Sequence, residues 1–149
     1  MPLIETDTLV AFLNKKDSYH ENAKEIIKRI SKGELDVKAS SVSLIELQLI
    51  YKSKQIEYEF ETDLGELQSI KNLEWASIDV ESCLSALYFR KTYNLSFFDS
   101  LHVGIAINLD KKIISQDQAY DNIAGLKKIP LTYYKTIKQK STLLKNGTK

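Results

Sequence analysis

Apolar residues along this chain alternate between short runs of strand length and longer stretches with helical spacing. Helical spacing is clearest from Ala23 to Ile30, where apolar residues recur every three or four positions before Gly33 ends the pattern. The same reasoning predicts helices over residues 8–14, 17–31, 42–53, 55–71, 79–93, 97–109 and 133–144. Short apolar runs predict strands over residues 3–6, 35–39, 74–78, 111–116 and 128–132.

Strands that alternate with helices along the whole chain indicate an α/β fold, in which a parallel sheet of about five strands is covered on both faces. The 149 residues suffice for one domain with a substantial core, so a single domain over 1–149 is expected. Within it, residues 132–149 are expected to form a basic C-terminal helix or tail. No apolar run approaches the roughly 20 residues of a membrane span, and the N-terminus lacks the basic segment of a signal peptide.

Cysteine, histidine and charge content narrow the possible chemistry. Cys83 is the single cysteine, which excludes a disulfide scaffold and favours a reducing, cytoplasmic location. With two histidines in the chain, any bound metal is expected to be a hard cation held by oxygen atoms. Seven lysines and no acid follow Leu126; since the whole chain carries +1, residues 1–125 carry −6.

The stretch from Asp79 to Tyr93 has the features of a capped amphipathic helix. Asp79 is suited to the N-cap position, and the apolar residues that follow it share one helical face. That face is expected to pack on the core, with Cys83 buried in it; its residues are Val80, Cys83, Leu84, Leu87 and Tyr88.

Two aspartates follow predicted strands. Asp7 comes after the first strand and Asp117 after the fourth, and ligands of a parallel sheet bind beyond the carboxyl ends of its strands. Each also has a purely structural interpretation. Asp7 could cap a helix that starts at Thr8, and Asp117 could be an ordinary turn residue.

Two further acids are isolated from other charges. Glu46 is the only charged residue between Lys38 and Lys52, and it lies on an apolar helical stripe. Asp99 is the only one between residues 91 and 110. The structural alternative for Asp99 is a capping box with Ser96. For Glu46, no lysine or arginine close in sequence is placed to form an ion pair. A buried carboxylate without a partner is costly, so Glu46 carries the stronger functional signal.

The four acids predict more together than each does separately. If they converge, each pair at about 4 Å repels by roughly 4 kcal/mol at an effective dielectric of about 20. A cation would then be needed, or some acids would hold a proton. Oxygen ligands without thiolate suit Mg²⁺ or Mn²⁺, which supports hydrolysis of phosphodiester bonds.

Three segments carry a resemblance to a known family, namely TDTLVAFLNKKDSYHENA, SSVSLIEL and LSFFDSLHVGIAINLDKKIISQD. Their order and their single fixed acids in apolar settings resemble the motifs of PIN-domain ribonucleases. The resemblance implies a three-layer α/β/α sandwich, Mg²⁺- or Mn²⁺-dependent cleavage of RNA, and frequently a homodimer. The compact chain is also similar to the toxin of VapBC-type toxin–antitoxin pairs, which implies a small antitoxin protein as partner.

The resemblance also assigns roles to individual residues. By it, Asp7, Glu46, Asp99 and Asp117 form the catalytic metal cluster. Ser115 stands where the family often has a threonine, two residues before the last acid, and keeps its hydroxyl. Independently of the resemblance, Thr8 could hold the Asp7 carboxylate or a water molecule, or could simply start the helix. Asp121 could be an extra ligand or equally a solvated helix cap.

Some alternatives remain open on the sequence alone. His102, one turn after Asp99, could contact a carboxylate or could be a histidine packed within a helix layer, which is the commoner case. The chain could be a catalytically silent PIN-like module that binds RNA or protein. A haloacid-dehalogenase-like phosphatase is disfavoured because no second aspartate stands two residues after Asp7, and a receiver domain is disfavoured by the motif around Glu46.

Overall fold

A parallel five-stranded sheet forms the centre of the protein in the computed structural model, which describes residues 1–135, 140 and 144–146. The strand order is β3-β2-β1-β4-β5, and every neighbouring pair is parallel. The strands are β1 (Leu3–Ile4), β2 (Lys38–Ser40), β3 (Glu74–Ala76), β4 (Lys112–Ile114) and β5 (Lys127–Ile129). The predicted parallel sheet of five strands is therefore confirmed.

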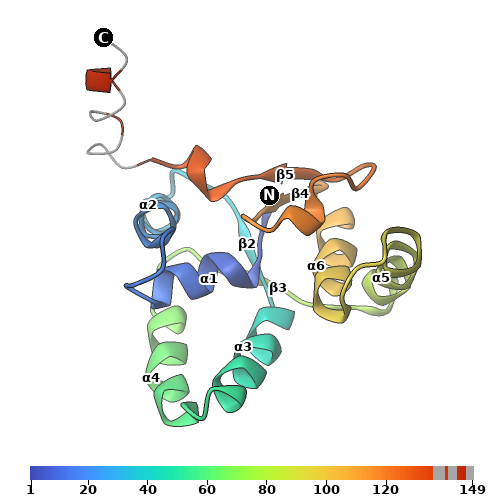
Figure 1. Cartoon of the computed structure of the whole chain (residues 1–149), viewed down its shortest axis with the longest axis horizontal. Coiled ribbons are helices and arrows are strands. Elements are labelled where there is room, and N and C mark those ends of the chain that lie inside the picture. The colour runs from blue at the N-terminus through green and yellow to red at the C-terminus, as the bar shows by residue number, and fades with distance from the viewer. Residues whose placement is uncertain (136–139, 141–143, 147–149) are drawn as a thin grey trace.

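Helices cover both faces of this sheet and create two hydrophobic cores (Figure 1). Neighbouring strand residues point to opposite faces, so Ile4 and Ile114 enter one core while Leu3 and Ile113 enter the other. The first core is closed by α1 (Thr6–Leu13), α2 (His20–Ser31), α3 (Val42–Ser53) and α4 (Glu57–Gln68). The second is closed by α5 (Val80–Tyr93) and α6 (Phe97–Ile107). The fold is a three-layer α/β/α sandwich.

Most predicted elements are present with shifted boundaries. The first strand ends at Ile4 rather than residue 6, and α1 starts at Thr6 rather than residue 8. Short 3₁₀ turns, η1 (Gln118–Tyr120) and η2 (Leu131–Tyr133), follow β4 and β5. The helix predicted over 133–144 and the basic tail predicted over 132–149 lie largely outside the described residues. None of the described helices is long and apolar enough to cross a membrane.

The orientation predicted for α5 is wrong. Asp79 does cap the helix, accepting a hydrogen bond from the Ser82 backbone N–H at 2.8 Å. The face that packs on the core, however, presents mainly small side chains, and Cys83 is exposed. The predicted core stripe faces outward, with Val80 78% and Leu84 63% exposed.

Close packing of α5 against α6 explains this reversal. A Cβ atom on Gly104 of α6 would lie 2.2 Å from the Ser82 carbonyl oxygen of α5, so only glycine permits the approach. The core face of α5 accordingly carries Ser82 and Ala86, whose side chains let the two backbones meet. The larger apolar residues of α5 are left on its outer side.

Candidate functional site

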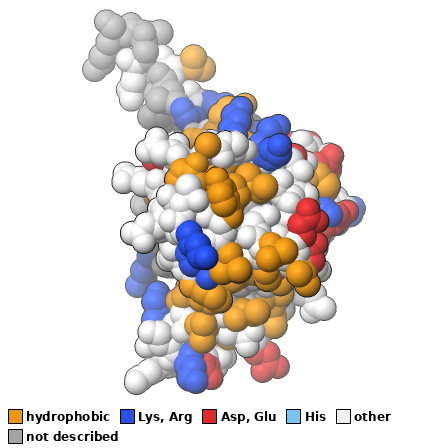
Figure 2. All heavy atoms as spheres, turned by 90° about the vertical axis from the view of Figure 1, so that its right-hand side faces the viewer, with side chains coloured by type: hydrophobic (Ala, Val, Ile, Leu, Met, Phe, Trp, Pro, Cys, Tyr) orange, Lys and Arg blue, Asp and Glu red, His pale blue; other side chains and the backbone are white. Residues whose placement is uncertain are grey.

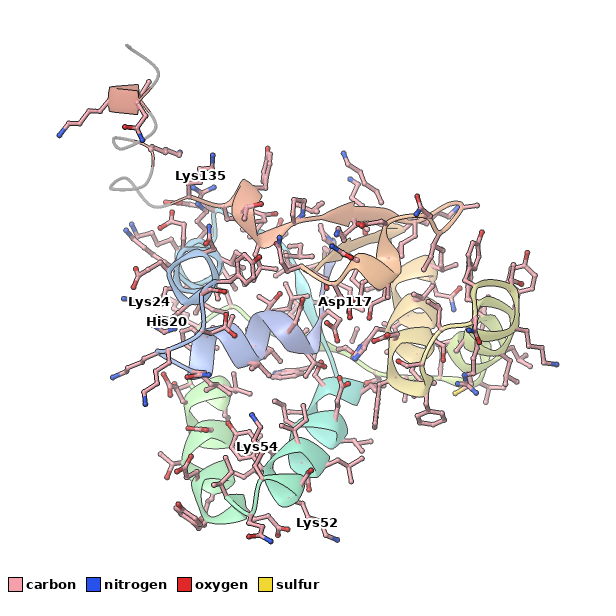
Figure 3. The ribbon with its side chains drawn as sticks, viewed as in Figure 1. His20, Lys24, Lys52, Lys54, Asp117 and Lys135 are labelled. Atoms are coloured by element: carbon pink, nitrogen blue, oxygen red, sulfur yellow. The ribbon has the colours of Figure 1, made fainter. Side chains whose placement is uncertain are left out.

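The predicted acidic residues come from segments that meet at the carboxyl edge of the sheet. The end of β1 leads into α1, the end of β2 leads into α3, and the end of β4 leads into η1. The labelled Asp117 lies in the middle of the view in Figure 3, between the ribbons of α1 and α6. This is the edge at which ligands of parallel sheets bind.

Glu5 is an acid of this site that the sequence reasoning missed. It follows β1 directly, is 4% exposed, and caps α1 by accepting a hydrogen bond from the Asp7 backbone N–H at 3.2 Å. The cap role considered for Asp7 therefore belongs to Glu5. The signal was available, because Glu5 is the first polar residue after the apolar pair Leu3–Ile4.

His102 joins Glu5 to Glu46. Its Nε2 atom lies 3.0 Å from Glu46 Oε1, 3.3 Å from Glu5 Oε1 and 3.1 Å from Thr6 Oγ1. The ring is fully buried, and its Nδ1 atom has no hydrogen-bond partner within the described part of the chain. Of the two interpretations considered for His102, the geometry supports contact with carboxylates over simple packing within a helix layer.

The neighbours of His102 Nε2 indicate its role. An ionised carboxylate only accepts hydrogen bonds, so Nε2 beside Glu46 Oε1 acts as the donor of that hydrogen bond. As a metal ligand, Nε2 would have to give up that proton, so His102 suits the role of hydrogen-bond donor better than that of ligand.

Glu5 and Glu46 have opposite protonation tendencies. Burial, followed by the neighbouring charges of Asp7 and Glu46, raises the pKa of Glu5 well above its usual value. For Glu46, burial acts to raise the pKa, but hydrogen bonds from His102 and Thr6 outweigh it and leave the pKa lowered. The Glu46 side chain is half-buried. The apolar stripe predicted around it is not wholly in the core, because Ile45 and Leu49 are exposed.

Asp7 lies in the first turn of α1 rather than at the helix cap, and its side chain is hydrogen-bonded to the segment that follows β4. Its Oδ2 atom accepts hydrogen bonds from Ser115 Oγ at 2.8 Å and from the Gln116 backbone N–H at 2.7 Å. Thr8 Oγ1 lies 3.4 Å from Asp7 Oδ1 and 3.3 Å from the Ile114 carbonyl oxygen, so it contributes more to the fold than to Asp7. Ser115 is the better-placed supporting residue.

Asp117 and Asp121 differ in their surroundings. The Asp117 backbone N–H donates to Ser115 Oγ at 3.0 Å, which places Asp117 and Asp7 on either side of the Ser115 hydroxyl. The Asp117 side chain is exposed and accepts from the Ala119 backbone N–H at 2.9 Å, as a turn residue does. Asp121 forms an ion pair with Lys128 instead. The structure therefore does not bring Asp121 into the group.

Asp99 starts α6 and faces a tyrosine. Its backbone N–H donates to Ser96 Oγ at 3.2 Å, so the predicted cap is present. Its Oδ1 atom accepts a hydrogen bond from the Tyr120 hydroxyl at 3.2 Å. Burial and then the charges of nearby acids raise the pKa of Tyr120; these acids are Glu5, Asp99, Asp7 and Asp117. Tyr120 therefore links Asp99 by a hydrogen bond to the neighbourhood of the other three acids.

The resulting group of acids fits an oxygen-preferring divalent cation. No lysine or arginine forms an ion pair with Glu5, Asp7, Glu46, Asp99 or Asp117 among residues 1–135. Burial, and after it the neighbouring acids Asp7 and Glu46, raise the pKa of Glu5. Among the described residues, one set of three possible ligand atoms lies within 4.8 Å of one another, from Glu5, Glu46 and His102, and Asp7, Asp99 and Asp117 belong to no such set. Carboxylate oxygens suit Mg²⁺ and Mn²⁺, with Glu5 taking the strand-end position predicted for Asp7.

A comparison with protein families identifies a family for this chain. The profile of the PIN domain family matches residues 3–126, which is most of the chain. This chain belongs to the PIN domain family. The match includes Glu5, Asp7, Glu46, Asp99 and Asp117, and it ends before the lysine-rich C-terminal segment.

Solved structures with similar folds are available for this PIN domain. VapBC2 from Rickettsia felis, bound to a promoter DNA fragment, has a TM-score of 0.69 at 16% identity, covering 86% of this chain and 96% of that one. DNA-bound VapBC from Salmonella typhimurium has a TM-score of 0.66 at 16% identity, covering 88% and 99%. A toxin–antitoxin complex from Klebsiella pneumoniae has a TM-score of 0.59 at 16% identity, covering 85% and 95%. No curated protein sequence matches significantly.

Proposed function

We propose that this PIN domain is a metal-dependent endoribonuclease that hydrolyses RNA phosphodiester bonds. The observation that carries the proposal is the cluster of five carboxylates at the carboxyl edge of the sheet, without a lysine or arginine ion pair among residues 1–135. Glu5, Glu46 and Asp99 would hold Mg²⁺ or Mn²⁺, with Asp7 and Asp117 beside them. A divalent ion bound there supplies positive charge to the scissile phosphoryl group and lowers the pKa of a water molecule.

The side chains around the acids orient them for this role. His102 donates toward Glu46, and Ser115 holds Asp7. Because both partners are fully buried, each carboxylate is fixed by a side chain that itself has little freedom to move. Because the pKa of Glu5 is raised, ion binding would compete with protons for this side chain.

Incubation with a panel of transfer and ribosomal RNAs tests the proposal. We expect cleavage that requires added Mg²⁺ or Mn²⁺ and stops when EDTA is present in excess, because the carboxylates alone supply no positive charge to the phosphoryl group. Cleavage that continues undiminished in EDTA would contradict a metal-dependent reaction.

The alternative is a catalytically silent PIN module that binds RNA or a protein. The exposed position of Asp117 is the observation in its favour, because that carboxylate already serves a local turn. A silent module would show neither RNA cleavage nor stabilisation by Mn²⁺ at any concentration. Stabilisation without cleavage would leave the metal site intact and remove the enzyme activity from the proposal.

We further propose that the protein is a VapC-like toxin whose site is blocked by a small antitoxin in the cytoplasm. The three similar structures are complexes of toxin–antitoxin type, and the free cysteine fits a reducing compartment. A groove of about 500 Å³ lies between the α1–α2 loop and the α3–α4 hairpin, and apolar side chains, three lysines and the acids Glu59 and Asp63 line it. A partner segment with apolar side chains would fit it, and the neighbouring reading frame should encode such a protein.

The outward face of α5 supports the proposal that two copies associate. Hydrophobic side chains gather on the side of the molecule that Figure 2 turns toward the viewer, where α5 and α6 lie. Asp79 and Glu81 begin the helix and Lys91 lies near its end. Two copies of α5 packed antiparallel about a twofold axis would bring Leu84 against Leu87 and each acidic end against the partner's lysine.

Replacing Leu84 by glutamate should convert such a dimer into a monomer. The new charges would face an apolar surface at the twofold axis and would lack a partner there. Sedimentation velocity measures the change, with Tyr58→Glu on the exposed part of α4 as the matched control that stays dimeric. A wild-type monomer, or a Leu84→Glu dimer, would refute association through α5.

A further inference from the structure

Tyr120 contributes a buried hydroxyl to the acid cluster that neither the sequence reasoning nor the proposed reaction has used. It lies on η1, three residues after Asp117, and its side chain is fully buried in the second hydrophobic core. The ring is therefore fixed by packing, while its hydroxyl reaches Asp99 on a different element. Burial of a tyrosine usually requires such a partner for its hydroxyl group.

The Tyr120 hydroxyl is a permanent hydrogen-bond donor at this place. A tyrosine hydroxyl ordinarily has a pKa of about 10, so it carries a proton to donate at neutral pH. Carboxylates offer only acceptors when ionised, so a donor among them is needed to fix an orientation. The hydroxyl donates to Asp99 Oδ1 at 3.2 Å, while no hydrogen bond to the second oxygen, Oδ2, is found in the described part of the chain.

We propose that Tyr120 is a positioning residue, which holds one oxygen of Asp99 so that the other is presented to a bound divalent cation. The inference rests on the proposed metal site and adds to it a residue that acts through Asp99. Outer hydrogen bonds of this kind orient ligating side chains before the ion arrives, and their loss typically reduces metal affinity by about 10- to 100-fold.

Tyr120→Phe tests the proposal because it removes the hydroxyl and keeps the ring in the core. We expect about tenfold weaker Mn²⁺ binding than in the wild type, measured from the free Mn²⁺ signal by electron paramagnetic resonance. Tyr93→Phe is the matched control. Its hydroxyl accepts a hydrogen bond from the Ala124 backbone N–H at 3.0 Å, in the loop after η1, so it should leave Mn²⁺ affinity unchanged.

The outcomes separate this inference from the proposed function. Weaker Mn²⁺ binding in Tyr120→Phe alone, with urea midpoints of both variants close to that of the wild type, supports the positioning role. Equal or tighter binding in Tyr120→Phe overturns it while the metal site stands, and so does an equal loss in Tyr93→Phe, which would indicate general packing. A wild type that binds no Mn²⁺ overturns both proposals.

Discussion

Glu5→Gln should abolish divalent-metal-dependent RNA cleavage while making the metal-free protein more stable at neutral pH. Glutamine keeps the shape of the side chain but cannot supply a carboxylate to a cation. Since changes to residues that merely support ligands cost about 10- to 100-fold, the loss of activity should be at least about a hundredfold. The cleavage assay with RNA and Mn²⁺ measures it directly.

The stability gain in Glu5→Gln has a definite pH dependence. The folded protein holds the Glu5 proton more tightly than the unfolded chain does, because burial and neighbouring acids raise its pKa. The stability that comes from the protonated group is thus complete below the usual pKa and is lost as the pH rises through the raised value. Urea unfolding should show the variant gaining on the wild type as the pH rises above the usual glutamate pKa of about 4.

A control variant for Glu5 is available in another strand. Glu74→Gln changes an exposed residue of β3 that pairs with Lys38 at 3.8 Å, so it should alter neither cleavage nor the pH dependence of stability. Full activity in Glu5→Gln would show that this carboxylate has no part in the reaction, even if its effect on stability were as expected.

Asp99→Asn should likewise eliminate cleavage and leave the fold intact. The substituted side chain leaves the backbone hydrogen bond to Ser96 in place, and its amide oxygen can still accept from Tyr120, so the start of α6 should keep its structure. Only the negative charge is lost, and with it a ligand for the cation. We expect at least about a hundredfold lower cleavage and weaker Mn²⁺ binding, with an unchanged circular dichroism spectrum.

The matched control for Asp99 lies just beyond the opposite end of the same helix. Asp110 pairs with the N-terminal amine of Met1 at 2.8 Å, at the other edge of the sheet. Asp110→Asn should therefore keep full activity and lose a little stability. Wild-type cleavage by Asp99→Asn would rule out the proposed role of the acid cluster, whatever the control shows.

The fold could be predicted from the sequence because its signals are local. Short apolar runs alternate with helical spacing in every part of the chain, and that alternation alone indicates a parallel sheet with two helical layers. The outward face of α5 could not be read in the same way. Apolar side chains usually face the core, and the close approach at Gly104 that reverses this preference joins two helices through tertiary packing.

The candidate site was predicted only in outline for a related reason. Isolation from other charges identified Glu46 and Asp99, and the strand-end rule pointed to the start of the chain. A two-residue error in the end of β1 then favoured Asp7 over Glu5. His102 and Tyr120 are distant in sequence from the acids they contact, with 56 residues separating His102 from Glu46, so no local pattern shows those contacts.

Anomalous X-ray diffraction from crystals of the full chain grown with Mn²⁺ tests whether folding gathers these acids into a site for one or more divalent cations. We expect an anomalous peak about 2.2 Å from carboxylate oxygens of Glu5, Glu46 and Asp99. Crystals grown at saturating Mn²⁺ that show no peak among these three side chains, or that bind Mn²⁺ only elsewhere on the surface, would contradict the proposed metal site.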